Sequence, residues 1–118
     1  MLEKFERAAR LLDLYKGIIS DKQRMMCSQY FLDNLSLSEI AENEGISRQA
    51  VHDGIERGIE TMEAAERSLR LIEKSDKLIE ILEEIKCLAA SVKDEEISGK
   101  LLSIISGIDA VTGEKTEE

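Results

Sequence analysis

The stretch LSLSEIAENEGISRQAV, residues 35–51, predicts two short helices joined by a tight turn. Ser36 and Glu39 have the spacing of a capping box, in which each side chain accepts a hydrogen bond from a free amide at a helix start. Gly45 offers the left-handed conformation that ends many helices, and Ser47 can cap the helix that follows. This order of signals is typical of a helix-turn-helix, whose second helix normally enters the major groove of DNA.

The composition of the 118-residue chain favours an all-α protein. It contains no proline, only 3% aromatic residues and many Leu, Ile, Glu and Lys residues. We expect one all-α domain over residues 1–110, with the helix-turn-helix at about 36–58, a long amphipathic helical part at about 59–106 and a disordered tail at 111–118. No apolar run reaches the roughly 20 residues that cross a bilayer, and the N-terminus lacks a signal-peptide pattern, so we expect a cytoplasmic protein.

The net charge of −9 weighs against strong binding to nucleic acid. Affinity for DNA comes largely from Lys and Arg side chains that neutralise phosphates. Residues 1–60 carry 8 basic and 11 acidic side chains, a net charge of −3, and the remaining residues carry −6. The acidity is therefore concentrated outside the helix-turn-helix, and DNA binding requires only that the contacting face be positive.

Two further helices are expected before the helix-turn-helix. Apolar residues at helical spacing predict a first helix over about residues 2–16, ended by Gly17. Ser20 and Gln23 form another capping box, which starts a second helix that continues through about Leu32.

The helix that begins after Ser47 continues into a long amphipathic region. Gly54 and Gly58 cost it roughly 1 kcal/mol each relative to alanine, and they also allow a bend or a close crossing by another helix. Farther on, Leu71, Leu78, Ile85 and Val92 recur every seven residues, with Leu82 and Ala89 on the intervening seam. The pattern leaves open whether residues 59–92 form one helix or two.

A last helix is expected to start at the acidic residues 94–96, which favour its dipole, and to stop at Gly107. Exposed apolar stripes are normally covered by partners. These C-terminal helices are therefore expected either to fold back on the N-terminal helices or, as the favoured alternative, to form a homodimer.

The cysteines give no sign of a metal site. Cys27 and Cys87 lie far apart, and His52 is the only histidine. We expect both cysteines to be small core residues in a reducing compartment, with a disulfide as the less favoured alternative. Because the sequence also shows no paired catalytic carboxylates, phosphate-binding glycine loop or nucleophile–base signature, we expect no enzyme, no metal and no cofactor.

The candidate DNA-binding residues are the exposed positions of the second helix of the turn motif. They are Ser47, Arg48, Gln49, His52, Asp53 and Arg57. Arg48 suits a bidentate contact with guanine and Gln49 one with adenine, whereas Ser47 and the helix amides suit a phosphate and Arg57 a backbone contact.

The alternative interpretation of these positions is structural. Ser47 then only caps the helix, Arg48 and Gln49 are only solvated, and Asp53, with Glu56 and Glu60, repels phosphate. A second basic cluster, Lys16, Lys22 and Arg24, is expected to be ordinary solvated surface, with a phosphate or an acidic partner as the alternative.

Several segments resemble the YlxM family of small bacterial helix-turn-helix proteins. They are LLDLY at 11–15, DKQR at 21–24, YFLDNLSL at 30–37, LSEIA at 37–41 and GISRQAV at 45–51. The resemblance covers roughly residues 1–105, and the helix-turn-helix is also similar to region 4 of bacterial sigma factors, which reads promoter DNA. The chain departs from the family at His52 and Gly54, where relatives usually carry tyrosine and asparagine.

The resemblance implies a non-enzymatic, DNA-binding protein. Family members are typically encoded beside Ffh, the GTPase of the signal recognition particle, which implies a role in that pathway. One hypothesis is a dimeric regulator that binds duplex DNA, with its C-terminal helices setting the spacing of half-sites. The other is an interaction module that binds the signal recognition particle protein or its RNA, through its acidic surface or through the helix that carries Met25 and Met26.

Overall fold

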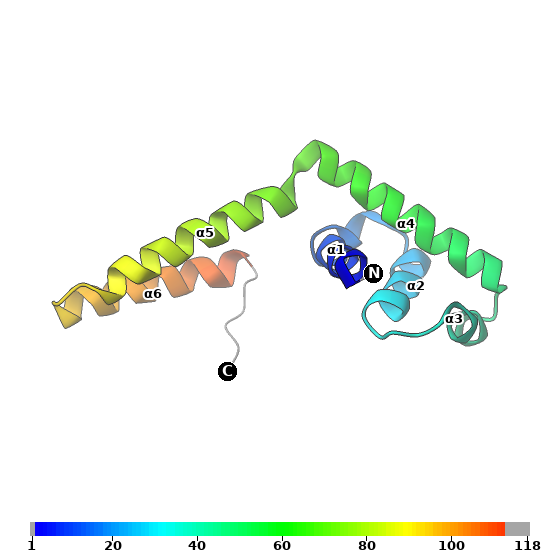
Figure 1. The fold of residues 1–118 in the computed structure, drawn as a ribbon, viewed down its shortest axis with the longest axis horizontal. Coiled ribbons are helices and arrows are strands. Elements are labelled where there is room, and N and C mark those ends of the chain that lie inside the picture. Colours follow the sequence, from blue (N-terminus) through cyan, green and yellow to red (C-terminus); the bar gives the residue numbers. More distant parts are fainter. Residues whose placement is uncertain (1, 113–118) are drawn as a thin grey trace. The chain divides into compact units, whose positions relative to one another are not determined.

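Six α-helices and one 3₁₀ helix make up the protein in a computed structural model, which describes residues 2–112 and, within them, the side chains of residues 2–108 (Figure 1). The elements are α1 (Leu2–Tyr15), η1 (Lys16–Ile18), α2 (Asp21–Phe31), α3 (Leu37–Glu44), α4 (Arg48–Leu69), α5 (Leu71–Ala90) and α6 (Glu95–Thr112). No strand occurs within residues 2–112, and the expected all-α fold is confirmed.

The chain divides into two compact units, each with an apolar core of its own. The N-terminal unit extends to Ile72 and the C-terminal unit begins at Glu73. The expected single domain over residues 1–110 stays a prediction. Along residues 2–112, no helix is both long enough and apolar enough to cross a membrane.

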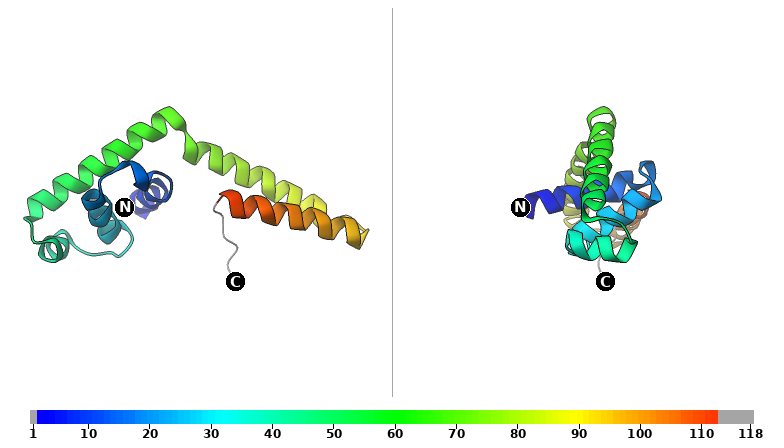
Figure 2. Two further views of the ribbon diagram at one scale, coloured as in Figure 1. Left: turned by 180° about the vertical axis from the view of Figure 1, so that it is seen from behind. Right: turned by 90° about the vertical axis from the view of Figure 1, so that its right-hand side faces the viewer.

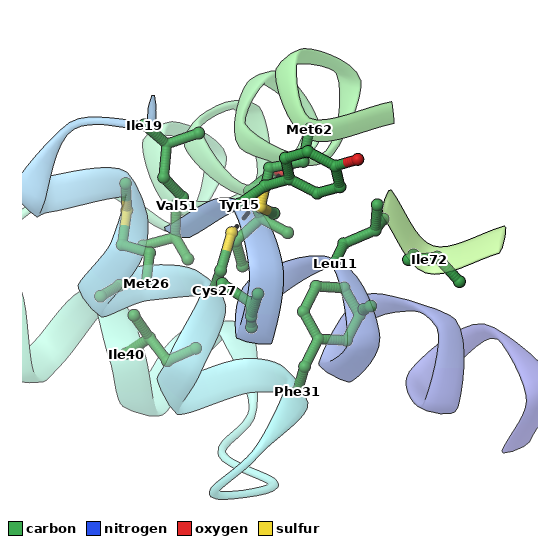
Figure 3. Packing of buried hydrophobic residues seen from close by; sticks show 14 residues of the cluster. Leu11, Tyr15, Ile19, Met26, Cys27, Phe31, Ile40, Val51, Met62 and Ile72 are labelled. Atoms are coloured by element: carbon green, nitrogen blue, oxygen red, sulfur yellow. Dashed lines mark hydrogen bonds between the residues drawn. The ribbon is translucent and has the colours of Figure 1, made fainter. Parts of the chain in front are cut away.

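In the N-terminal unit, α4 is the helix against which α1, α2 and α3 all pack. Val51, Ile55 and Met62 lie on its buried face at helical spacing. Figure 3 shows Leu11 and Ile40, which are fully buried, entering the same core from α1 and α3. The long helix that carries the candidate DNA-binding residues is therefore held along its length by three other helices.

The start signals of the helix-turn-helix act as predicted. The hydroxyl of Ser36 accepts a hydrogen bond from the Glu39 amide at 3.1 Å, and the Glu39 carboxylate accepts one from the Ser36 amide at 2.8 Å. The Ser20 capping box of α2 is also present. Gly45 ends α3 with φ of +69°, in the left-handed region that suits glycine.

Three predicted helix ends differ from the structure. The first helix ends at Tyr15, and Gly17 lies inside the 3₁₀ helix that follows. The second ends at Phe31, one residue before its predicted end. Gly107 does not stop the last helix, because Ile108 beyond it still packs on the apolar core of the C-terminal unit and offsets the modest cost of a helical glycine.

The tail predicted at 111–118 falls mostly outside the described residues. Positions 111 and 112 belong to α6, and positions 113–118 are not described.

The region predicted as one or two helices consists of two, and a polar cluster marks the break. Arg70 adopts the left-handed conformation with φ of +57° and ends α4. The carboxylate of Glu66, a buried residue, accepts hydrogen bonds from the Tyr15 hydroxyl at 2.6 Å and from the Ile72 amide at 3.0 Å. The Tyr15 hydroxyl accepts one from the Leu71 amide at 3.1 Å, so residues of α4 and α1 together cap the start of α5.

The two glycines of α4 allow a close crossing by α2. A Cβ atom on Gly54 would lie 2.3 Å from Met26 Cε, and one on Gly58 would lie 3.1 Å from Cys27 Sγ. Helix α4 nevertheless continues unbroken through both positions. Of the two roles expected for these glycines, close crossing is the one found.

The two cysteines have different surroundings, which corrects the expectation that both are core residues. Cys27 is fully buried, and burial raises the pKa of its thiol to about 11. Cys87 is exposed, because it lies on the polar side of α5, away from the apolar stripe. Both thiols are free, so the alternative of a disulfide does not apply.

In the C-terminal unit, α5 and α6 lie side by side as an antiparallel hairpin (Figures 1 and 2). Leu82 and Ala89 of α5 and Ile105 of α6 are its buried core. The hydroxyl of Ser98 also donates a hydrogen bond to the Ala89 carbonyl at 2.8 Å. The seam predicted to contain Leu82 and Ala89 is therefore the one that α6 covers.

Candidate nucleic-acid interface

The candidate DNA-binding residues lie on the exposed side of α4, directly after the turn. Val51 and Ile55 point into the core, whereas Arg48, Gln49 and His52 are exposed. Because a helix repeats every 3.6 residues, the same turns that anchor α4 also present these polar side chains to solvent. The structure thus leaves Arg48, Gln49 and His52 accessible in the first turns of α4.

Ser47 has a structural role whether or not it also meets a ligand. Its hydroxyl accepts a hydrogen bond from the Ala50 amide at 3.0 Å and so caps α4. The side chain is exposed, and it stands at the amide end of a 22-residue helix. That position combines a helix cap with the positive end of the helix dipole.

Three of the predicted residues contact one another or their neighbours along α4. The Gln49 amide donates a hydrogen bond to Asp53 Oδ1 at 3.1 Å. His52 Nδ1 lies 3.5 Å from the same oxygen, and its Nε2 lies 3.8 Å from Glu56 Oε2. In the free protein, the donor of Gln49 is thus held by a carboxylate of its own helix.

Arg48 differs from these residues in its surroundings. It is exposed and forms no ion pair with any side chain that the structure describes. Its guanidinium presents a fork of donors that is free to meet a base edge or a phosphate. Arg48 is therefore the predicted residue best placed to bind a nucleic acid directly.

A groove of about 350 Å³ lies where the start of α2 crosses α4. Lys22 of α2 and Arg57 of α4 line it, together with Ser20, Gly54 and the carboxylate-bearing Asp53. Two cations from segments far apart in the sequence thus border one hollow beside the exposed face of α4. The sequence predicts Lys22 to belong to a separate cluster, because no local signal shows that α2 and α4 meet here.

The basic cluster predicted around the first turn is divided in the structure. Arg24 forms an ion pair with Asp21 and donates a hydrogen bond to the Lys16 carbonyl at 3.4 Å. Lys22 instead lines the groove next to α4. Of this cluster, Lys22 is the residue that the fold brings near the candidate interface.

His52 also borders a second hollow on another side of α4. This groove of about 140 Å³ is lined mainly by apolar and aromatic side chains, including Tyr30, Phe31 and Ile59, and Lys4 also lines it. Within residues 2–108, no group of three or more His, Cys, Asp or Glu side chains is arranged to hold a metal ion. What the described surface offers is hydrogen-bond donors, cations and apolar hollows.

Comparison with known proteins agrees with this architecture. Residues 2–102 match the family model described as "Putative helix-turn-helix protein, YlxM / p13 like". The chain is 38% identical over 111 residues to the UPF0122 protein BH2485 of Halalkalibacterium halodurans, which covers 94% of this chain and 99% of that one. It is 39% identical to the UPF0122 protein ABC2295 of Shouchella clausii, over 92% of this chain and all of that protein.

A third relative is the UPF0122 protein YlxM of Bacillus subtilis. It is 38% identical over 108 residues, which cover 92% of this chain and 98% of that protein. These matches confirm the family resemblance seen in the sequence. The chain belongs to the YlxM/p13-like family of helix-turn-helix proteins.

Proposed function

We propose that the α3–α4 helix-turn-helix binds duplex DNA, with the first turns of α4 in the major groove. The observation that carries the proposal is the row of exposed polar side chains on α4, which follows a capped turn and lies opposite the buried face of the helix. This is the arrangement through which helix-turn-helix proteins reach base edges. The helix-turn-helix description of the matched family supports the same interpretation.

Each polar residue has a role that follows from its chemistry. Arg48 binds guanine through two donors, and Gln49 binds adenine once its amide leaves Asp53. Lys22 and Arg57, beside the α2–α4 groove, contact the phosphates of one strand. Asp53 accepts a hydrogen bond from a cytosine amino group, which lessens its repulsion of the backbone.

The first test measures binding of the full-length protein to a labelled mixed-sequence duplex by fluorescence anisotropy at low salt. We expect saturable binding, and we expect Arg48→Ala to weaken it by about 5- to 150-fold, corresponding to the loss of roughly 1–3 kcal/mol for a base contact. Lys100→Ala is the matched control, because it removes one exposed cation from α6 of the C-terminal unit. Circular dichroism checks that both variants keep their helices.

Two results would contradict the proposal. One is the absence of duplex binding even at low salt. The other is an equal loss of affinity in Arg48→Ala and Lys100→Ala, which would show that only total charge matters.

The proposed DNA-binding form contains two copies of the chain, joined through their C-terminal units. A two-fold dimer presents two α4 helices and so reads two half-sites. The apolar positions that α5 and α6 leave exposed support this association, since patches of this kind are normally covered.

A second candidate function is recognition of the signal recognition particle GTPase or its RNA. The specific observation in favour of a protein partner is the acidic character of α4, where Asp53, Glu56 and Glu60 are exposed and Glu56 lines the apolar groove at His52. Titration of the labelled GTPase and of the labelled RNA in the same assay separates the two functions. Saturable binding of either one, without binding of the duplex, would favour the second.

A further inference from the structure

We infer that one face of the α5–α6 hairpin is the contact surface for a second copy of this chain. The face consists of Leu78, Ile81, Ile85 and Leu88 of α5 with Ile97 and Ile104 of α6, and we call it the open seam. The inference rests on the dimer in the proposed function. It adds that, of two neighbouring lines of apolar residues on α5, the exposed one joins the two copies.

The residues of α5 in the open seam have the spacing of a coiled coil. Positions 78, 81, 85 and 88 follow the alternating steps of three and four residues that place a side chain at each core position of a heptad. All four remain exposed, and Leu88 is 69% exposed. The line beside them, Leu82 and Ala89, is the one that α6 buries. Helix α5 therefore carries two adjacent apolar lines, of which the hairpin covers one.

Helix α6 widens the same face. Ile97 and Ile104 are seven residues apart and are 50% and 63% exposed. Helix α6 runs antiparallel to α5 (Figure 1). Counted by helical periodicity from the buried Ile105, Ile97 and Ile104 therefore fall on the side of the hairpin that carries the open seam, and the exposed Leu102 falls on the other side. The six residues thus form one apolar strip along both helices.

The hairpin has a small apolar core of its own. Among the side chains that the structure describes, Leu82, Ala89 and Ile105 are buried in it, compared with 14 in the N-terminal core. Units of fewer than about 70 residues often add a disulfide, a metal or association to a core of this kind. The thiols are free, and the described side chains form no metal site. Covering the open seam with a second copy would add its exposed apolar side chains to this core.

A second copy fits the open seam in shape and in charge. Two identical hairpins that meet through heptad positions form a four-helix bundle, and a two-fold contact is self-complementary. Lys77 and Glu84, which flank the seam at equivalent heptad positions, carry opposite charges. When two α5 helices pair antiparallel, these flanking positions face one another, so a lysine of one copy can approach a glutamate of the other.

The experiment is sedimentation velocity on the full-length chain over a range of concentrations. We expect the native protein to be a dimer. The substitutions Leu88→Glu and Ile104→Glu should each raise the dissociation constant of the dimer at least about 100-fold, because the new carboxylate would be buried in an apolar contact. Leu102→Glu is the matched control: it makes the same change at an exposed position on the other side of the hairpin, and we expect it to stay dimeric. Circular dichroism confirms that the monomeric variants keep their helices.

Each outcome has a definite meaning. A native protein that is monomeric at every concentration would overturn the open seam and the proposed dimer together. A dimer that survives Leu88→Glu and Ile104→Glu, or that Leu102→Glu dissociates equally, would overturn the open seam alone. Absence of duplex binding by the native protein, with the dimer intact, would overturn only the proposed DNA binding, so the two proposals fail separately.

Discussion

Cys27 and Cys87 show how strongly the reactivity of a thiol depends on its surroundings. Both are free thiols, yet one is enclosed by the N-terminal core and the other faces solvent. Only the thiolate reacts readily with disulfide reagents. With its pKa raised to about 11, Cys27 is ionised to only about one part in a thousand at pH 8, and it is also shielded.

We predict that titration of the native protein with an aromatic disulfide reagent at pH 8 detects one fast thiol, and that the second appears only when denaturant is added. Cys87→Ser should abolish the fast reaction and leave the slow one unchanged. Two fast thiols in the native protein would show that Cys27 is not enclosed as described.

Residue roles could be predicted from the sequence where the partner is close along the chain. Ser36 and Glu39 are three residues apart, and Gly45 acts through its own backbone conformation. The role of Glu66 could not be predicted in this way. Its hydrogen bond to Tyr15 joins residues 51 positions apart, and neither side chain carries a local sign of it.

At the scale of helices, the crossing of α2 over α4 depends on the absence of a side chain at Gly58. A Cβ atom there would lie 3.1 Å from Cys27 Sγ, which is enclosed and has little room to move. Overpacking of this kind typically costs roughly 1–3 kcal/mol, and the better helix propensity of alanine returns about 1 kcal/mol. The steric term is therefore the larger.

We predict that Gly58→Ala lowers the free energy of unfolding by about 1 kcal/mol. In a Cys27→Ala background, Gly58→Ala should lower the free energy of unfolding less, or even raise it. The obstructing sulfur is then absent, whereas the higher helix propensity of alanine remains. Denaturant unfolding followed by circular dichroism measures all four proteins of this cycle. Additive effects of the two substitutions would contradict the close contact.

Helix starts were more predictable than helix ends. Capping boxes and the Ser47 cap predict a helix start to within a few residues. In contrast, α4 ends at Arg70, where the left-handed residue is not the glycine that usually marks a helix end. The heptad pattern of α5 likewise predicts a helix without showing which apolar line is covered. Both lines repeat every seven residues, and only the position of α6 distinguishes Leu82 and Ala89 from the rest.

For the whole molecule, charge has opposite consequences for the two proposed associations. Binding to DNA releases counterions from the phosphates. The proposed phosphate contacts of Arg57 and Lys22 correspond to a slope of about −2 for the logarithm of affinity against the logarithm of salt concentration, per bound copy. Two copies with a net charge of −9 each repel one another, and salt screens that repulsion.

We predict that rising salt weakens duplex binding steeply and leaves the dimer equally strong or stronger. Anisotropy and sedimentation over the same salt series measure the two effects. A dimer that dissociates as salt rises would indicate that ion pairs, rather than the open seam, hold the copies together.

The sequence predicted which residues of α4 are exposed, because helical periodicity decides that. It did not predict the groove that joins Lys22 to Arg57, since that hollow exists only where two helices cross. Whole-molecule features of this kind depend on packing between distant segments, which no local pattern encodes.

The end of the N-terminal unit at Ile72 also has a consequence for the order in which the protein folds during synthesis. The core of the N-terminal unit is complete once Ile72 has been synthesised, because every buried residue of that core lies at or before this position. Domains generally fold in order as they emerge during synthesis. The open seam includes Ile104 and therefore exists only later, after the helix-turn-helix has had the chance to fold. A nascent chain can thus hold a finished α4 before it is able to recruit its second copy.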